Sequence, residues 1–374
     1  MSKLLILANN DIGLYNFRKE LLERLIGEGF ELHIALPYGE FVENMKEMGC
    51  IFHPTEFDRR GTNPFQELKM VGMYKRILRE VKPDVVLSYT IKPNIYGGMA
   101  CAALKIPYIV NVTGLGTALG ERGILQLVTI KLYRRAMRRV CKILFQNDDN
   151  EQFFTEHKIA VGRHGRIPGS GVNLERYRYL PYPTEGPAEF LFISRILREK
   201  GIDEYMEMAE RIKEAYPDTV FRILGFCEDD SDKPDSYRKR IARLEEKGIL
   251  HFEGMQKDIT PFLMRAQCTI HPSFYPEGMS NVCLESAASG RPVITTLHTG
   301  CRETVEDGVT GFLVEPGNAQ ALTEAVRRFL AMPMEERAKM GREARRKMER
   351  EFDRQIVVDT YRKEINAAMQ TEEK

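Results

Sequence analysis

The sequence predicts an α/β protein with two domains, each built on a doubly wound parallel sheet. Its 374 residues exceed what one ordinary core holds, and a hydrophobic content of 43% without low-complexity tracts indicates globular structure throughout. Short, near-continuous apolar runs alternate with helical patterns in both halves, which is typical of parallel strands covered on both faces. A proline-rich stretch at 177–187 separates the halves. We therefore expect domains at 1–180 and 181–350, and a C-terminal helix at 351–374 that packs back toward the first domain.

The expected elements alternate regularly along the chain. In the first half, strands are predicted at 3–8, 31–36, 84–88, 108–111 and 142–146, and helices near 15–28, 41–48, 65–81, 95–104 and 123–140. In the second half, strands are predicted at 189–194, 220–224, 250–253, 268–271, 293–295 and 312–314. The stretch 335–368 is a long charged helical pattern with little apolar surface, which we expect to cover other parts of the protein rather than to form a third domain.

Cysteine usage and hydropathy indicate a cytoplasmic protein. The seven cysteines are scattered and form no C-x-x-C pair, so their spacing suggests neither a disulfide framework nor a zinc site. The apolar run that begins at Lys3 is predicted to be a strand, because it is too short and too poorly flanked for a signal peptide. No apolar run approaches the roughly 20 residues of a membrane span.

Charge is distributed unevenly and points to an anionic partner for the first half. Residues 1–180 carry 26 Lys+Arg against 19 Asp+Glu, a balance of +7, whereas the remainder carries 29 against 35, a balance of −6. Between Arg122 and Asn147 there is no acidic residue, and the basic ones are Arg122, Lys131, Arg134, Arg135, Arg138, Arg139 and Lys142.

These basic residues alternate with apolar ones, so residues 122–142 are predicted to form a basic amphipathic helix of the kind that lies on anionic lipid. We expect peripheral association with the inner face of the plasma membrane. The competing interpretation is a solvated crossover helix packed on the sheet. Nucleic acid is not an expected partner, because no aromatic platform or recognition motif accompanies the charge.

The most informative stretch runs from Pro272 to Glu285. The turn after the strand at 268–271 contains Glu277, and a helix follows from about Ser280 to Ser289. With Ser280 or Asn281 as N-cap, free backbone N–H groups and the positive end of the helix dipole form an anion site. Taken alone, this spacing favours two solvated glutamates beside a cap, Glu277 and Glu285. The alternative is a glycosidase pair, whose carboxyl separation of roughly 5–9.5 Å the spacing does not decide.

Further polar residues follow predicted strands, where open α/β sheets bind ligands. Arg195 and Lys200 come directly after the first strand of the second half, and a guanidinium with an ammonium is suited to a diphosphate, although a surface charge cluster is the alternative. Gly13 lies in the first strand–helix turn, where no G-x-G-x-x-G supports a nicotinamide or flavin site. It either brings backbone close to a phosphate or sugar, or is a simple turn glycine. Lys92 and Asn94 could reach hydroxyl or phosphate groups of an acceptor.

Taken together, these features resemble the family 4 retaining glycosyltransferases of the GT-B architecture, in which two Rossmann-like domains face each other across a cleft. The resemblance covers essentially the whole chain. It is carried by Ser194-Arg195 with Lys200-Gly201, by Glu277 to Asn281 through Glu285, and by the stretches 300–303 and 307–315. The stretches 90–94 and 112–116 resemble the subgroup that assembles surface polysaccharide or glycan on a polyprenyl-diphosphate carrier.

The resemblance implies a role for each matched residue. Glu277, Arg195 and Lys200 would be catalytic: Glu277 would contact hydroxyls of the transferred sugar, and the two cations would bind the donor diphosphate and stabilise the leaving group. Glu285 would accept hydrogen bonds from the ribose hydroxyls. The other expected donor contacts are Gly13, Gln256, Lys257, Gly278, Met279, Ser280 and Asn281. The expected acceptor contacts are Asn16, Thr90, Lys92, Asn94, Asn111 and Thr113.

One departure from the family pattern concerns the general base. Many relatives place a histidine at the end of the strand that ends near Asn111, and this chain has Asn111-Val-Thr113 there, so no base carries over. The resemblance implies a retaining, metal-independent transferase that moves a hexose or N-acetylhexosamine from a UDP-sugar to a polyprenyl-diphosphate-linked saccharide, with no cofactor beyond that substrate.

Two alternatives share the architecture, a nucleotide-sugar 2-epimerase and a non-catalytic sugar-nucleotide-binding protein. The basic helix favours a transferase over the epimerase. The presence of Arg195, Lys200, Glu277 and Glu285 argues against the binding protein.

Overall fold

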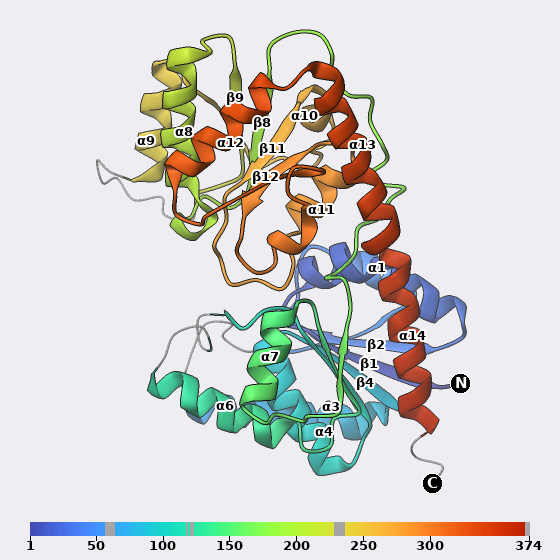
Figure 1. Ribbon diagram of the computed structural model, residues 1–374. Coiled ribbons are helices and arrows are strands. Elements are labelled where there is room, and N and C mark those ends of the chain that lie inside the picture. The colour runs from blue at the N-terminus through green and yellow to red at the C-terminus, as the bar shows by residue number, and fades with distance from the viewer. Residues whose placement is uncertain (57–63, 117–118, 120–122, 228–235, 371–374) are drawn as a thin grey trace. The chain divides into compact units, whose positions relative to one another are not determined.

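The computed structural model describes residues 1–56, 64–116, 119, 123–227 and 236–370. It divides into two compact α/β units, which are described separately (Figure 1). The first unit comprises Met1–Gly171, Pro276–Gly278 and Arg354–Lys374, and the second comprises Val172–Tyr275 and Met279–Asp353. Within the described ranges, no helix combines the length and apolar character that crossing a membrane requires.

The first unit contains a parallel sheet in the order β3-β2-β1-β4-β5-β6-β7. Its strands are β1 (Lys3–Leu7), β2 (Glu31–Leu36), β3 (Ile51–Pro54), β4 (Val85–Tyr89), β5 (Tyr108–Val112), β6 (Lys142–Phe145) and β7 (His164–Arg166). Its helices are α1 (Asp11–Gly27), α2 (Val42–Glu47), α3 (Pro64–Val81), the π-helical η1 (Pro93–Gly97), α4 (Gly98–Leu104), α6 (Ile124–Ala136), α7 (Asp148–Glu156) and α14 (Arg354–Gln370).

Strand β1 shows why helices cover both faces of this sheet. Its side chains point alternately to opposite faces, and Leu4, Leu5, Ile6 and Leu7 are all fully buried. Leu5 and Leu7 pack in one apolar cluster with residues of α3, α4 and α6. Leu4 and Ile6 pack in another with residues of α1 and α14. The continuous apolar run in the sequence therefore marks a central strand between two helical layers.

The second unit contains a parallel sheet in the order β10-β9-β8-β11-β12-β13. Its strands are β8 (Glu189–Ile193), β9 (Val220–Leu224), β10 (His251–Gly254), β11 (Cys268–His271), β12 (Val293–Thr296) and β13 (Gly311–Val314). Its helices are η2 (Arg198–Lys200), α8 (Ile202–Ala215), α9 (Tyr237–Glu246), α10 (Thr260–Arg265), α11 (Asn281–Ala288), η3 (Arg302–Thr304), α12 (Ala319–Ala331) and α13 (Met334–Glu351).

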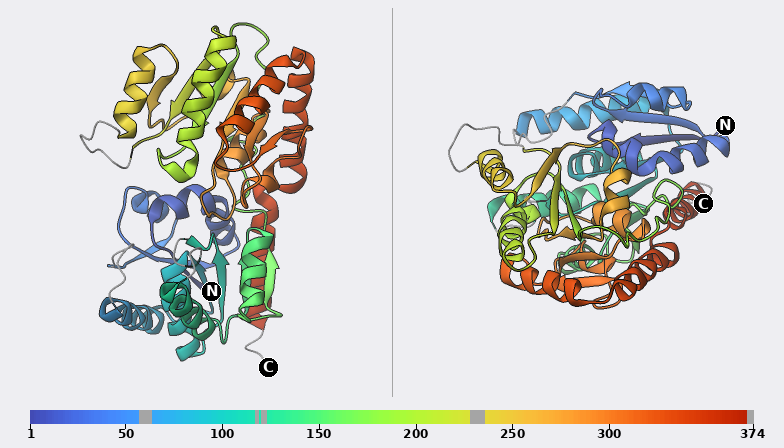
Figure 2. Two further views of the ribbon diagram at one scale, coloured as in Figure 1. Left: turned by 60° about the vertical axis from the view of Figure 1, so that its left-hand side comes forward. Right: turned by 90° about the horizontal axis from the view of Figure 1, so that it is seen from above.

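Helices lie on both faces of this sheet too (Figure 2). Residues of α8, α9 and α12 share one apolar cluster with Phe190, Phe192 and Phe221 of the strands. Residues of α11 and α13 share a cluster with Val293, which lies on the other face. The second half is therefore a doubly wound α/β unit, as the alternating pattern predicted.

Two edge strands, β3 and β7, were not predicted. Their residues are mostly exposed or half-buried, and β7 reads His164-Gly165-Arg166. An edge strand with little burial carries no continuous apolar run, so its sequence does not distinguish it from a loop.

The C-terminal stretch 335–368 is two helices rather than one. Helix α13 belongs to the second unit, and α14 belongs to the first. The expectation of little apolar surface is wrong for α14, because Val357, Val358, Tyr361 and Ile365 are buried. Arg354 at its start forms an ion pair of 2.9 Å with Glu20 of α1.

The basic stretch 122–142 is also shorter as a helix than predicted. Helix α6 ends at Ala136, Arg138 and Arg139 lie in the turn after it, and Lys142 begins β6. Arg122 lies outside the described residues.

Arg291 ties the proline-rich stretch to the second unit. Its side chain has no exposed surface and donates hydrogen bonds to the backbone oxygens of Leu263 (2.6 Å), Pro181 (2.8 Å) and Leu180 (3.1 Å). Burial lowers the pKa of this guanidinium to about 10. These bonds join Leu180 to the second unit, which begins at Val172 rather than at residue 181.

We expect Arg291→Met to lower the free energy of unfolding by about 3 kcal/mol or more, because three buried carbonyl oxygens lose their donors. The measurement is a urea titration followed by circular dichroism. Arg342→Met, at an exposed position of α13, is the control and should stay within about 0.5 kcal/mol of the wild type. Equal stability of both variants would show that the buried network does not hold the segment.

Candidate active site

Arg195 and Lys200 converge on one aromatic ring at the carboxyl end of the second sheet. Arg195 follows β8, and Lys200 ends η2 with only 6% of its surface exposed. The Arg195 guanidinium lies 5.5 Å and the Lys200 ammonium 4.7 Å from the centre of the Tyr275 ring. Because β8 and β11 are neighbours, the loops after these two strands meet. The two predicted diphosphate ligands are therefore held together beside the turn that follows β11.

Gly201 allows this close approach of the two loops. Its φ is +76°, and a Cβ atom there would lie 2.2 Å from the backbone oxygen of Pro272. The Phe274 N–H also donates to the Glu199 oxygen at 2.8 Å. Only glycine combines this left-handed conformation with the absence of a side chain that would push the loops apart.

Helix α11 begins where the sequence predicted an anion site. Ser280 is the N-cap, and its side chain accepts a hydrogen bond of 3.5 Å from the Cys283 N–H. The Ser280 N–H donates to the oxygen of Gly300 at 2.7 Å, which anchors the start of the helix. Met279 is buried, whereas Asn281 and Glu285 are half-buried, with Glu285 one turn further along the helix. The positive end of this helix therefore lies just after the turn that carries Tyr275.

Glu277 lies on the segment Pro276–Gly278, which belongs to the first unit. The Asn147 side chain donates hydrogen bonds to the backbone oxygens of Gly278 (2.6 Å) and Glu277 (3.3 Å). A Cβ atom on Gly278 would lie 2.2 Å from Oε1 of Gln146 and 2.6 Å from the backbone oxygen of Thr113. The Glu277 segment is thus packed against the residues that follow β5 and β6.

The predicted acceptor residues divide into two groups. Asn94 and Asn111 are each 1% exposed and form hydrogen bonds within the first unit. The Asn94 side chain donates to the backbone oxygen of Asn111 at 2.8 Å, and the Asn111 side chain donates to the Tyr361 hydroxyl at 2.6 Å. Thr90, Lys92 and Thr113 keep some exposed surface. Lys92 forms an ion pair of 2.8 Å with Glu67, so its charge is already partly compensated.

The remaining predicted contacts are spread over both units. Gly13 lies in the first turn of α1, where its N–H donates to the side chain of the N-cap Asn10 at 2.6 Å. The backbone oxygen of Asn16 accepts a hydrogen bond of 3.2 Å from Arg354. Lys257 is exposed and Gln256 is half-buried after β10, where the Gln256 side chain donates to the Glu253 oxygen.

The fold also brings together three residues that spacing alone did not connect. Side-chain ligand atoms of His271, Cys283 and Cys301 lie within 4.8 Å of one another and are buried, which makes them the one group in the described part of the chain that could hold a metal ion. Burial raises the pKa of the Cys283 thiol, but a hydrogen bond with Cys301 and the charge of His271 outweigh it and lower the pKa to about 6. These residues come from β11, α11 and the turn before η3, so no short cysteine motif in the sequence predicts the cluster.

Two parallel α/β units, with cations and a capped helix at adjacent strand ends of the second, are the architecture of a GT-B glycosyltransferase. Two family models match the chain: Glycosyl transferase 4-like over residues 3–147 and Glycosyl transferases group 1 over residues 182–347. Together they account for most of both units. The chain belongs to these GT-B glycosyltransferases.

Curated relatives and a solved structure agree with this assignment. The chain is 26% identical over 344 residues to the N,N'-diacetylbacillosaminyl-diphospho-undecaprenol alpha-1,3-N-acetylgalactosaminyltransferase of Campylobacter jejuni, covering 86% of this chain and 87% of the relative. It is 24% identical to the capsular polysaccharide biosynthesis glycosyltransferase CapM of Staphylococcus aureus, covering 83% of each chain. The Anabaena HepE crystal structure in complex with UDP matches with a TM-score of 0.79 at 17% identity, covering 98% of this chain and 100% of that chain. At that identity the structural match shows the fold alone.

Proposed function

We propose that this glycosyltransferase moves a hexose or N-acetylhexosamine from a UDP-sugar to a saccharide on a polyprenyl-diphosphate carrier, with retention of configuration. The observation that carries the proposal is the similarity over 86% of the chain to a transferase that acts on an undecaprenol-diphosphate-linked sugar. The convergence of Arg195 and Lys200 beside Tyr275 supports a diphosphate-bearing donor.

In the proposed reaction, the bond between the anomeric carbon and the donor phosphate breaks as the acceptor hydroxyl bonds to the same face of that carbon. The hydroxyl proton passes to an oxygen of the departing diphosphate, so no protein base is required. Arg195 and Lys200 would stabilise the charge that develops on this leaving group. Glu277 would orient the sugar hydroxyls. Since these cations can take the place of a metal ion on the diphosphate, we propose that transfer is metal-independent.

The donor assignment is tested by calorimetric titration of the protein with UDP and with GDP. We expect UDP to bind and GDP to bind at least about tenfold more weakly, which corresponds to about 1.4 kcal/mol. A preference for GDP would contradict the proposed donor class, and binding of neither nucleotide would contradict the proposed function.

We further propose that the protein acts at the cytoplasmic membrane face through α6 and the turn after it. At the start of α6, Ile124, Leu125, Leu127 and Val128 are exposed, with exposed fractions of 83%, 52%, 60% and 46%. Exposed cations follow at Lys131, Arg134, Arg135, Arg138 and Arg139. An exposed apolar end followed by cations matches the boundary between acyl chains and anionic head groups.

Neutralising Arg134, Arg135, Arg138 and Arg139 together is expected to abolish sedimentation with anionic vesicles. Near a charged surface each cation contributes about 1 kcal/mol, and added salt screens this attraction. Wild-type binding should therefore fall as the salt concentration rises. Equal binding of the wild type to neutral and anionic vesicles would refute the membrane role and favour the nucleotide-sugar 2-epimerase alternative.

A further inference from the structure

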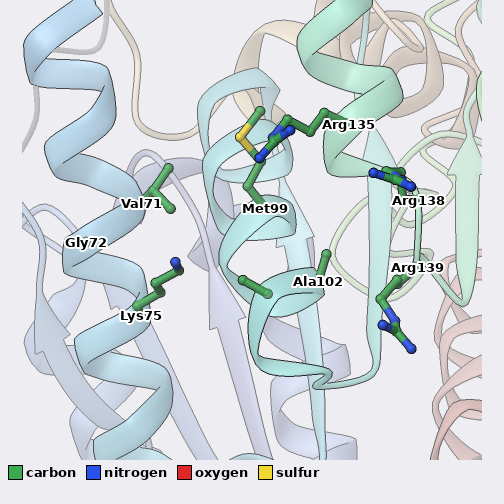
Figure 3. A pocket seen from close by; sticks show the side chains of 9 residues that line it. Val71, Gly72, Lys75, Met99, Ala102, Arg135, Arg138 and Arg139 are labelled. Atoms are coloured by element: carbon green, nitrogen blue, oxygen red, sulfur yellow. The ribbon is translucent and has the colours of Figure 1, made fainter.

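A basic groove on the first unit is not used by the proposed transfer reaction. It has a volume of about 730 Å³ and is lined by residues of α3, α4 and the end of α6 (Figure 3). Its cationic lining residues are Lys75, Arg135, Arg138 and Arg139, and none of the described lining residues is a carboxylate. Such a surface is electrostatically complementary to an anion.

The four cations are available to a ligand. Among the described residues, none of them forms an ion pair with a carboxylate. Arg135, Arg138 and Arg139 are exposed, and Lys75 is half-buried. Lys75 reaches the groove from α3, whereas the arginines come from the end of α6 and the turn after it (Figure 3). The groove thus presents cations from two separate elements, with α4 between Lys75 and Arg138.

The rest of the lining is apolar. Val71 projects from α3, and Met99 and Ala102 belong to α4 between the two sources of charge. A surface with cations around small apolar side chains fits an amphiphile with an anionic head better than it fits a free nucleotide. The groove also shares α6 with the exposed apolar residues Ile124 and Leu127, which lie near the other end of that helix.

The position of the groove argues against the acceptor diphosphate as its occupant. Ala102 on α4 shortly precedes β5, and Arg139 shortly precedes β6, so the groove lies toward the amino ends of these strands. Thr113, a proposed acceptor contact, follows the opposite end of β5. The five residues of β5 extend over roughly 16 Å. A diphosphate attached directly to the acceptor sugar cannot occupy the groove while that sugar reaches the Thr113 end.

We infer that the groove binds the phosphate head group of an anionic phospholipid of the bilayer, and that it holds the protein on the membrane at a discrete site. This inference rests on the proposed function, which places the acceptor in a membrane. It differs from general attraction to a charged surface, because it predicts saturable binding of a single lipid molecule in the absence of a bilayer.

The test is calorimetric titration of the full chain with dihexanoyl phosphatidylglycerol below its micelle concentration. We expect saturable one-to-one binding and much weaker binding of the zwitterionic dihexanoyl phosphatidylcholine. Lys75→Gln and Arg138→Gln should each weaken phosphatidylglycerol binding by about tenfold or more, as expected for the loss of a charge-assisted contact. Lys69→Gln removes the same charge from an exposed position of α3 outside the groove, and it should change the affinity by less than about threefold.

Three results would overturn the inference. These are the absence of saturable binding, an equal loss in the Lys69→Gln control, and tighter binding of farnesyl diphosphate that Lys75→Gln and Arg138→Gln both abolish. The last would make the groove a subsite for the carrier diphosphate. The UDP affinity of the same variants should be unchanged. UDP titration of the wild type also separates the two hypotheses, because protein that binds phosphatidylglycerol but not UDP would contradict the proposed function alone.

Discussion

Replacing Glu277 by Gln is expected to lower the rate of sugar transfer by roughly 100- to 1000-fold, the usual effect of removing one group that stabilises a transition state. The substitution keeps the size of the side chain and removes its charge. The backbone of residues 277 and 278 is held independently by the Asn147 side chain, so the segment should keep its place. The expected result is therefore a loss of turnover with UDP affinity within about threefold of the wild type.

The measurement is a single-turnover assay beside a UDP titration. Glu246→Gln, an exposed glutamate on α9, is the matched control and should behave as the wild type. If Glu277→Gln also turned over at the wild-type rate, Glu277 would not be a catalytic residue. If it lost UDP affinity and turnover equally, its role would be in donor binding.

Arg195→Ala is expected to weaken UDP binding by about 10- to 100-fold, because hydrogen bonds to charged groups contribute about 1.5–3 kcal/mol. Arg195 and Lys200 share the Tyr275 ring, so Lys200→Met should have an effect of similar size. Because the two cations act on one ligand group, the effects in the double variant should not add.

Arg198→Ala is the control for this prediction. Arg198 lies in η2 and is exposed. Its replacement by alanine removes the same charge from the same loop. A comparable loss of UDP affinity in Arg198→Ala would mean that the loop attracts the nucleotide only through its overall charge. Unchanged UDP affinity in Arg195→Ala would contradict the proposed diphosphate site.

The central strands and the start of helix α11 could be predicted from sequence because local patterns encode them. Buried parallel strands such as β1 and β4 contain apolar runs, and the N-cap at Ser280 depends on residues a few positions away. The edge strands β3 and β7 have no such pattern. The same holds for Arg291, whose buried partners at residues 180, 181 and 263 are distant in sequence.

The burial of Asn94 and Asn111 could not be predicted for the same reason. Asn94 follows β4 and Asn111 lies near the end of β5, where ligand-binding residues are common, but each donates a hydrogen bond to a buried partner from another element. In the case of Asn111 that partner is Tyr361, a residue of the C-terminal helix. The cluster of His271, Cys283 and Cys301 likewise arises only when strand, helix and loop meet. Non-local contacts of this kind decide whether a polar residue serves the fold or a ligand.

The central claim is tested most directly by a transfer assay with purified protein, a panel of UDP- and GDP-linked sugars, and a polyprenyl-diphosphate-linked monosaccharide in detergent. We expect one UDP-sugar to extend the lipid-linked acceptor in the presence of a metal chelator. Nuclear magnetic resonance of the product should show the anomeric configuration of the donor. An inverted linkage, a strict need for added metal, or transfer only from a GDP-sugar would contradict the central claim.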